Sequence, residues 1–224
     1  MRAVLFDVFG TLLDVYSVQA AADRLFPGCG QRLALLWREK QIEYSRLRTL
    51  SSRYVPFIEV TRDALRYAIE ALSLPHAPEQ IDALLAEYAR LRPFDDVAPA
   101  FARLRERDVV LGVLSNGDPA MLQSALGHAG LLPDLTHVLS ADAVRQFKTA
   151  DAVYALGPQA LGLPAQDIVF VSSNGWDAIG AAWFGYTTYW VNRSGAPLDR
   201  LGQSPHGRGI GLESAVDFVL QPFR

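Results

Sequence analysis

A run of four apolar residues, Ala3 to Phe6, followed directly by an aspartate constrains this chain most strongly. Such a short, continuous apolar run is typical of a strand buried inside a parallel sheet. Asp7 has no packing role there, because an unpaired buried charge is costly, and Gly10 permits a sharp bend just beyond it. Since α/β folds place their reacting groups at the carboxyl ends of parallel strands, we interpret Asp7 as a nucleophile. An ordinary aspartate that begins a turn is the alternative, and the strand alone does not decide between the two.

The composition limits the classes of protein to which this chain can belong. Half of the 224 residues are apolar, which is enough for a full core in one large domain or in one domain with an insertion. The net charge of −3 gives no reason to expect nucleic acid or an anionic membrane as a partner. The single cysteine, Cys29, excludes an intrachain disulfide and fits a reducing compartment. No apolar run is long enough to cross a bilayer, and the first strand leaves no room for a signal peptide, so we expect a soluble cytoplasmic protein.

The segment between the first strand and residue 95 has a helical pattern. We predict helices over residues 18–25, 31–53, 61–72 and 78–90, the first capped by Ser17 and the third by Thr61. An all-helical block at this place is typical of an insertion into an α/β fold. We therefore expect a helical cap domain of residues 16–94 and a core domain of residues 1–15 and 95–224.

The rest of the chain alternates between strands and helices. Further strands are expected over residues 109–114, 137–140, 168–171 and 187–191, and helices over residues 97–107, 119–129, 150–161 and 178–184. Residues 195–211 are rich in Gly, Pro and Ser and are expected to be a loop, and residues 215–220 a final edge strand. This alternation predicts a doubly wound, Rossmann-like α/β core with a parallel sheet and right-handed crossovers.

Polar residues follow several of the predicted strands. Ser115-Asn116-Gly117 and Ser172-Ser173-Asn174 end two of them, and Lys148 lies in a loop that can reach the same edge of the sheet as Asp7. Each tripeptide by itself is more simply read as a turn, because turns favour these residue types. Together and in this order they indicate a reaction site.

The ordered set of motifs resembles a known family. Asp7-x-x-Gly10-Thr11 is typical of the haloacid dehalogenase-like superfamily, and its combination with Ser115-Asn116, Lys148 and Ser172-Ser173-Asn174-Gly175-Trp176-Asp177 is similar to the L-2-haloacid dehalogenases. The segment Trp37-Arg38-x-Lys40-Gln41-x-x-Tyr44 adds to the likeness, which extends through Val191. Phosphatases of the superfamily carry a second aspartate, which protonates the leaving group, where this chain has Phe9. A halide needs no proton to leave.

The resemblance implies a covalent mechanism on a small 2-haloalkanoate. The Asp7 carboxylate attacks C2, halide leaves, and an aspartyl ester forms with inversion. Water then attacks the carbonyl carbon of Asp7, so an (S)-2-haloacid gives an (R)-2-hydroxy acid. Lys148 keeps Asp7 ionised, Thr11 orients it, and Asp177, oriented with Ser172 and Asn174, positions or activates the water.

The remaining residues of the predicted site bind the substrate and the halide. Arg38 joins the catalytic set and also binds halide together with Asn116 and Trp176, although a solvated helix arginine is the alternative for Arg38. The substrate-binding residues are expected to be Phe9, Gly10, Leu12, Ser115, Asn116 and Tyr154. For Tyr154, an ordinary core aromatic is an equal alternative. The family commonly has Lys-Pro where this chain has Lys148-Thr149, and Thr149 is expected to cap the following helix.

The same comparison of motifs gives our expectations for metals, cofactors and partners. Superfamily phosphatases hold Mg²⁺ with an acidic cluster, but here Asp177 is the only acid in the last motif and Lys148 can satisfy both carboxylates, so we predict no metal and no cofactor. Members of the family are commonly dimers, which implies a homodimer, although the sequence shows no interface signature.

Two alternative functions are disfavoured. A phosphatase or phosphotransferase is disfavoured by Phe9 and Asn174. A non-catalytic protein with a decayed site is disfavoured because every expected charged group is present.

Overall fold

The core of the protein is a six-stranded sheet in which every neighbouring pair of strands is parallel. The computed structural model describes residues 2–221. The order of the strands is β3-β2-β1-β4-β5-β6. Their bounds are Ala3–Phe6 (β1), Val110–Ser115 (β2), His137–Ser140 (β3), Ile168–Ser172 (β4), Thr187–Val191 (β5) and Gly207–Gly209 (β6). The prediction of a doubly wound parallel α/β core is confirmed.

The first strand lies at the centre of the sheet and its register sets the position of the site. All four residues of β1 are at most 1% exposed. Phe6 is paired with Val113 of β2 and with Val171 of β4, so β2 and β4 end within two residues of the end of β1. The Asp7 amide continues this ladder by donating to the Val171 carbonyl at 2.9 Å. Asp7 and the residues after β2 and β4 therefore emerge together at one edge of the sheet.

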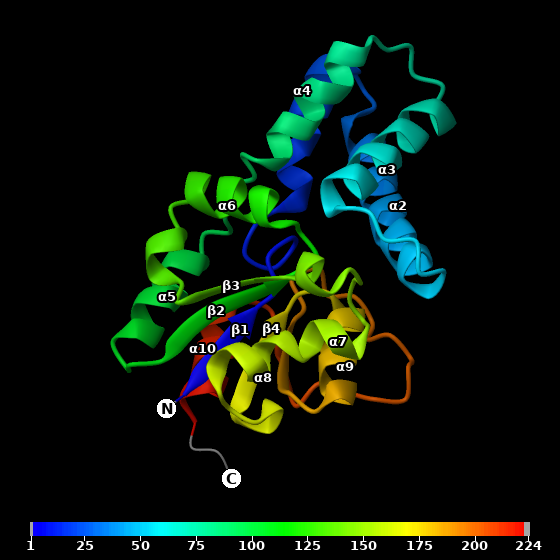
Figure 1. The fold of residues 1–224 in the computed structure, drawn as a ribbon. Helices are drawn as coiled ribbons and strands as arrows, with labels where there is room; N and C mark the ends of the chain where they lie inside the picture. The colour runs from blue at the N-terminus through cyan, green and yellow to red at the C-terminus, as the bar shows by residue number, and fades with distance from the viewer. Residues whose placement is uncertain (1, 222–224) are drawn as a thin grey trace.

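Helices cover both faces of the sheet (Figure 1). The helices α5 (Val97–Arg105), α6 (Pro119–His128) and α10 (Leu212–Leu220) belong to one layer, in which α5 packs against α10. The other layer holds α7 (Asp151–Tyr154), α8 (Leu156–Leu161) and α9 (Gly175–Phe184). Three short 3-10 helices complete the core: η2 (Leu132–Asp134), η3 (Ala141–Val144) and η4 (Ala165–Asp167).

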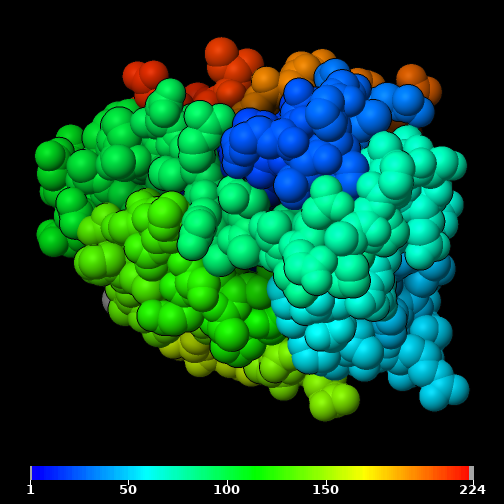
Figure 2. Space-filling model, turned by 90° about the horizontal axis from the view of Figure 1, so that it is seen from above, coloured from blue at the N-terminus to red at the C-terminus, as the bar shows by residue number. Residues whose placement is uncertain are grey.

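A helical cap rises from the carboxyl edge of the sheet (Figure 1). It contains η1 (Val15–Val18), α1 (Gln19–Leu25), α2 (Gly30–Leu50), α3 (Phe57–Ala71) and α4 (Pro78–Tyr88). Backbone hydrogen bonds join the two chain segments that lead into and out of the cap. Asp14 N donates to the Arg92 carbonyl at 2.8 Å, and Phe94 N donates to the Leu12 carbonyl at 3.0 Å. In Figure 2 the cap helices, blue to blue-green, form one continuous surface with the green segments of the core. The division at residues 15/16 and 94/95 remains our proposal.

Several predicted element boundaries are wrong for identifiable reasons. Residues 215–220 are part of α10 and not an edge strand: Leu212, Ala215, Val216 and Val219 are buried at helical spacing, which a short apolar run conceals. The predicted loop over residues 195–211 contains β6. The helix expected over residues 150–161 is divided into α7 and α8, and α9 begins at Gly175, three residues earlier than predicted.

Two predicted helix caps are also wrong. Thr61 lies inside α3, which begins at Phe57, and its buried hydroxyl donates to the Phe57 carbonyl at 2.8 Å. Ser17 lies within η1, and Asp14 caps that helix by accepting from Tyr16 N. Asp118, by contrast, caps α6 as expected of an aspartate before a proline, accepting from Met121 N at 3.1 Å. Within residues 2–221, no helix is long and apolar enough to span a bilayer.

Candidate active site

The Asp7 carboxylate lies at the centre of a group of buried polar side chains. It is 6% exposed. Lys148 Nζ lies 3.0 Å from Asp7 Oδ1, while Thr11 Oγ1 and Asn174 Nδ2 each donate to Oδ2 at 2.9 Å. These partners come from the turn after β1, the loop before α7 and the end of β4. The structure therefore brings three of the predicted catalytic residues together around the carboxylate of a fourth.

Lys148 joins Asp7 to a second buried carboxylate. Its Nζ also lies 2.9 Å from Asp177 Oδ2, and the lysine and Asp177 side chains are 1% and 0% exposed. Tyr154 donates its hydroxyl to Asp177 Oδ1 at 2.7 Å. Tyr154 is thus hydrogen-bonded to Asp177 and is also a fully buried core aromatic.

The charges of this cluster influence one another. Burial by itself lowers the pKa of Lys148, but the carboxylates of Asp177 and Asp7 outweigh it and the pKa is raised. Burial raises the pKa of Asp177, which the Lys148 ammonium only partly opposes. Burial and the neighbouring Asp177 raise the pKa of Tyr154 as well. Lys148 is accordingly a fixed positive charge and Tyr154 a fixed proton donor.

Side chains hold the backbone N–H groups of Phe147 and Lys148. Lys148 N donates to Asn116 Oδ1 at 2.8 Å and Phe147 N to Thr49 Oγ1 at 2.9 Å. The Lys148–Thr149 peptide bond is cis. The prediction that Thr149 caps the next helix is wrong, because the cap residue of α7 is Ala150. The Thr149 side chain instead packs on α9, where a Cβ at Gly180 would lie 2.6 Å from Thr149 Cγ2.

Arg38 reaches the site from the cap. It is 8% exposed, so it is not a solvated helix arginine. Its Nη2 donates to the Phe9 carbonyl at 2.9 Å and its Nη1 to Gln41 Oε1 at 2.6 Å. Gly10 makes this geometry possible: its φ of +95° is a conformation that side chains disfavour, and it turns the chain directly after Phe9. The predicted bend at Gly10 is confirmed.

A pocket of about 420 Å³ opens beside these residues. Its wall includes Gly10, Arg38, Asn174 and Trp176, all of which were predicted to belong to the site. The complete lining consists of Gly10, Asp14, Val15, Tyr16, Arg38, Phe94, Ser173, Asn174, Gly175, Trp176, Arg193 and Ser194. A second cavity of about 230 Å³, between the cap and α6, is lined by none of the predicted site residues.

The comparisons with known proteins agree on one family. The sequence model of the haloacid dehalogenase-like hydrolases matches residues 1–185. The (S)-2-haloacid dehalogenase of Pseudomonas sp. (strain YL) is 42% identical over 217 residues, which cover 97% of this chain and 94% of that relative. This chain belongs to the (S)-2-haloacid dehalogenase family of haloacid dehalogenase-like hydrolases.

Solved structures of the family share the whole fold. A crystal structure of an L-2-haloacid dehalogenase superposes with a TM-score of 0.96 at 50% identity and covers 99% of both chains. The L-2-haloacid dehalogenase from Xanthobacter autotrophicus with chloropropionic acid covalently bound superposes with a TM-score of 0.91 at 36% identity and covers 98% of both chains.

The other predicted site residues of this dehalogenase-family chain lie close to the cluster. Ser115 and Ser172 are buried at strand ends, where their hydroxyls accept from Gly117 N and Asn174 N. Phe9 and Leu12 are buried as well, at 3% and 0% exposure. The ring of Phe9 contacts two aromatics of the cap, with its centroid 6.1 Å from that of Phe57 and 5.9 Å from that of Tyr88.

Sequence reasoning missed several residues at the site. Arg193 lines the pocket, forms an ion pair with Asp96 and lies with its guanidinium 3.9 Å from the centre of the Phe94 ring. Arg193 follows β5 by two residues. The expectation that polar residues at the ends of parallel strands lie at the site therefore applies to Arg193 as it does to Ser115 and Ser172. Thr49 and Tyr54 of the cap carry no motif, and no signal in the sequence pointed to them.

The charged groups of the site do not suit Mg²⁺. Within the described range 2–221, no group of three or more His, Cys, Asp or Glu residues could hold a metal ion. The cation between the carboxylates of Asp7 and Asp177 is the Lys148 ammonium, at 3.0 and 2.9 Å. A magnesium ion needs several oxygen ligands, and a lysine between them would repel it.

Proposed function

We propose that this protein hydrolyses short-chain (S)-2-haloacids to (R)-2-hydroxy acids and halide through a covalent ester on Asp7. The observation that carries the proposal is the buried Asp7 carboxylate held by Lys148, Thr11 and Asn174 with a phenylalanine, Phe9, where a phosphatase needs an acid. The names of its relatives support the substrate class, and the covalent chloropropionic acid adduct of the Xanthobacter autotrophicus dehalogenase supports the ester.

In the first step the Asp7 carboxylate displaces halide at C2. A bond forms between a carboxylate oxygen and C2 while the carbon–halogen bond breaks, and the halide leaves with the bonding electron pair. Attack from the side opposite the halogen inverts C2. The Lys148 ammonium pairs with the nucleophile, and Thr11 and Asn174 fix its orientation.

The leaving halide requires positive charge and N–H donors. Arg38 supplies a buried guanidinium on the pocket wall, and Trp176 lies on the same wall. The Asn116 amide oxygen already accepts from Lys148 N, so its NH₂ group remains as a donor. The backbone and hydroxyl around Ser115 and Asn116 would hold the substrate carboxylate.

In the second step water attacks the ester carbonyl of Asp7. One water proton is transferred to a base and the other ends on the alcohol oxygen of the product. The bond between the carbonyl carbon and that oxygen breaks, and the Asp7 carboxylate is restored as the hydroxy acid leaves. Asp177 is the proposed acceptor of the first proton, because burial raises its pKa above the ordinary value of 3.8. Ser172 and Asn174 orient this part of the site.

The test is halide release from separate L- and D-2-chloropropionate in the presence of EDTA. We expect chloride from the L form alone, since one face of C2 is presented to Asp7, and no effect of EDTA. Asp7→Asn should lower the rate on the order of 10³-fold or more, because an amide is a poor nucleophile. Absence of halide from chloro-, bromo- and fluoroacids alike would contradict the proposal, and phosphate release that requires Mg²⁺ would favour a phosphatase instead.

We further propose that the protein acts in the cytoplasm as a homodimer. The single cysteine supports a reducing compartment. Leu47 and Leu50 on α2 are 52% and 83% exposed, which supports an interface on the outer face of the cap. Light scattering tests the dimer: the wild type should have twice the mass of the chain and Leu50→Lys a lower mass. A monomeric wild type would contradict the proposal.

A further inference from the structure

A second set of contacts joins the cap to the loop that carries Lys148. This loop runs from η3 (Ala141–Val144) to Phe147 and Lys148. The end of α2 and the connection from α2 to α3, residues 51–56, lie against it. None of residues 49–56 is among the residues that line the 420 Å³ pocket.

Side chains of the cap contact both the backbone and the ring of Phe147, the residue before Lys148. Thr49 Oγ1 accepts from Phe147 N at 2.9 Å. The Phe147 ring is fully buried, and its centroid lies 5.1 Å from that of Tyr54 and 5.7 Å from that of Phe57. Three side chains of the cap therefore hold the position of this one core residue.

Tyr54 adds a charged hydrogen bond at the start of the loop. Its hydroxyl donates to the carboxylate of Asp142, and the Arg145 guanidinium lies 5.4 Å from its ring centre. Asp142 is itself fixed in the core, because its N–H donates to Ser140 Oγ at 3.1 Å. Burial and the hydrogen bond to Asp142 raise the pKa of Tyr54, so the phenol remains a donor.

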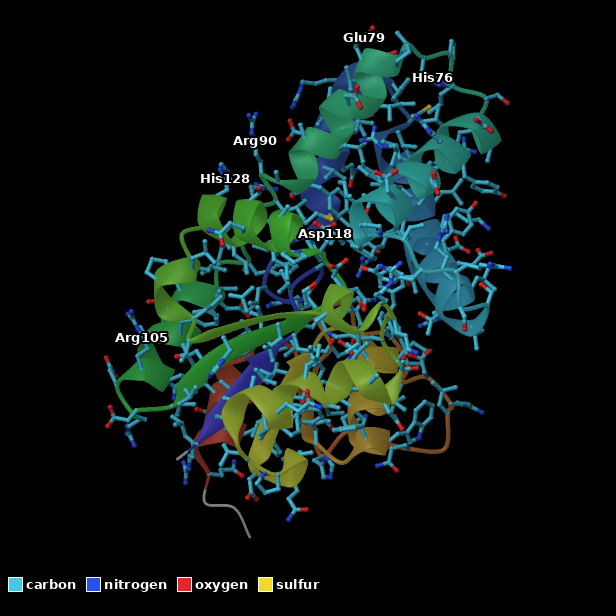
Figure 3. The ribbon with its side chains drawn as sticks, viewed as in Figure 1. His76, Glu79, Arg90, Arg105, Asp118 and His128 are labelled. Atoms are coloured by element: carbon cyan, nitrogen blue, oxygen red, sulfur yellow. The ribbon has the colours of Figure 1, made fainter. Side chains whose placement is uncertain are left out.

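The core holds the same loop from the opposite side. Lys148 N donates to Asn116 Oδ1 at 2.8 Å, and the lysine side chain extends to Asp7 and Asp177. Close by, Asp118 lies between α6 and the cap (Figure 3), where its Oδ2 accepts from Ile58 N at 3.0 Å. The loop is thus held between the end of β2 and the α2–α3 connection of the cap.

We propose that Thr49 and Tyr54 are positioning residues that fix the Phe147–Lys148 loop and thereby the Lys148 ammonium between Asp7 and Asp177. The proposal rests on the dehalogenase function given above. It makes lysine placement depend on contact between cap and core. A cap that swings away from the sheet to admit substrate gives up the bonds to Phe147 and Asp142, and its return restores them.

The experiment compares variants that remove one polar atom each. Tyr54→Phe removes the hydroxyl and keeps the ring, and Thr49→Val removes the acceptor and keeps the shape. We expect kcat to fall roughly three- to tenfold in each, with KM changed less than about twofold, because one hydrogen bond on the loop is lost. Thr49→Ser, which keeps the acceptor oxygen, should retain wild-type kcat.

Matched controls separate positioning from general stability. Tyr67→Phe is the same substitution on the same cap, but at a residue that is 41% exposed and is not among the residues that line the pocket. It should change neither kcat nor KM. Hydrogen exchange followed by mass spectrometry should show faster exchange in residues 143–150 for Tyr54→Phe and Thr49→Val and not for Tyr67→Phe.

The outcomes are distinct. Wild-type exchange in residues 143–150 of both variants, or equal losses in Thr49→Ser and Thr49→Val, would overturn the positioning role. A fall in kcat confined to the two loop-facing variants, with faster loop exchange, would establish it. If the wild type releases no halide at all, the proposed function fails, while the exchange measurement still shows whether the cap holds the lysine loop.

Discussion

At the scale of single residues, the site is defined by one buried cation between two carboxylates. Lys148 is 1% exposed and bonds to both Asp7 and Asp177. Such a triad is stable only as a complete unit, because removal of one charge leaves the others buried and uncompensated. The sequence predicted Asp7, Lys148 and Asp177, and it predicted that Lys148 can satisfy both carboxylates. The direct bond between Lys148 and Asp177 depends on the packing of α7 against α9.

The raised pKa of Lys148 predicts how stability depends on pH. The folded chain holds the lysine proton more tightly than the unfolded chain, whose ordinary value is 10.5. The contribution of Lys148 to the free energy of unfolding is therefore full below that pH and declines as the pH rises through the folded pKa. Buried Tyr154, with an ordinary value of 10.0 and a raised pKa, acts in the same direction.

Chemical denaturation at a series of pH values measures this dependence. Lys148→Met should cost about 3 kcal/mol or more at neutral pH, because two buried carboxylates lose their partner. The decline of stability above about pH 10 should be shallower in Lys148→Met than in the wild type. Tyr154→Phe, measured alongside, isolates the tyrosine contribution. Parallel curves for wild type and Lys148→Met would contradict the assignment.

At the scale of elements, strands were easier to predict than the ends of helices. β1 and β4 are continuous apolar runs whose burial on both faces follows from composition alone. α3 begins four residues before the predicted cap, because Thr61 bonds inside the helix to Phe57 and to Gln41 of α2. α10 was mistaken for a strand because its polar residues are few and its buried stripe begins before Ala215.

The close contact of α9 with the lysine loop gives a prediction for Gly180. A Cβ there would lie 2.6 Å from Thr149 Cγ2 and 2.7 Å from the Tyr154 hydroxyl. Gly180→Ala should therefore cost about 1–3 kcal/mol of stability and lower kcat, because it displaces Tyr154 from Asp177. Thermal unfolding and steady-state kinetics measure the two effects.

Gly127 in α6 is the matched control. A Cβ there meets only Leu132 Cδ1, at 3.3 Å, the end of a flexible side chain. Gly127→Ala should leave kcat unchanged and keep stability within about 1 kcal/mol of the wild type, since alanine favours the helix. An active, fully stable Gly180→Ala variant would show that Thr149 and Tyr154 have room to move.

At the scale of the whole molecule, the position of the cap depends on the two chain segments that join it to the core. Arg193, after β5, donates to both oxygens of Asp96 at 2.8 and 2.9 Å and to the Thr11 carbonyl at 3.2 Å. Asp96 Oδ2 also accepts from Leu212 N at 2.8 Å. One arginine thus links β5, the turn after β1 and the segment that leaves the cap.

This link should be lost in acid. Burial raises the pKa of Asp96, but the hydrogen bonds from Arg193 and Leu212 N outweigh it, so the pKa lies below its ordinary value of 3.8. The stability that Asp96 contributes is present above pH 3.8 and lost as the pH falls through the folded pKa. Arg193→Met should lower stability at neutral pH and flatten this acid decline, while Asp7 and Lys148 stay intact. Denaturation curves between pH 3 and 7 check this, and an unchanged acid slope would contradict it.

The sequence by itself determined the fold class and the order of the motifs, and it predicted Asp7 as the nucleophile. These features are local: an apolar run, a glycine turn and a polar strand end each lie within a few residues. The tertiary structure alone decided which distant side chains meet. Arg38 bonds to the Phe9 carbonyl, Tyr54 to Asp142 and Arg193 to Asp96 across 29, 88 and 97 positions of the chain. Such contacts depend on how the cap packs on the sheet, and no periodicity within one segment encodes that packing.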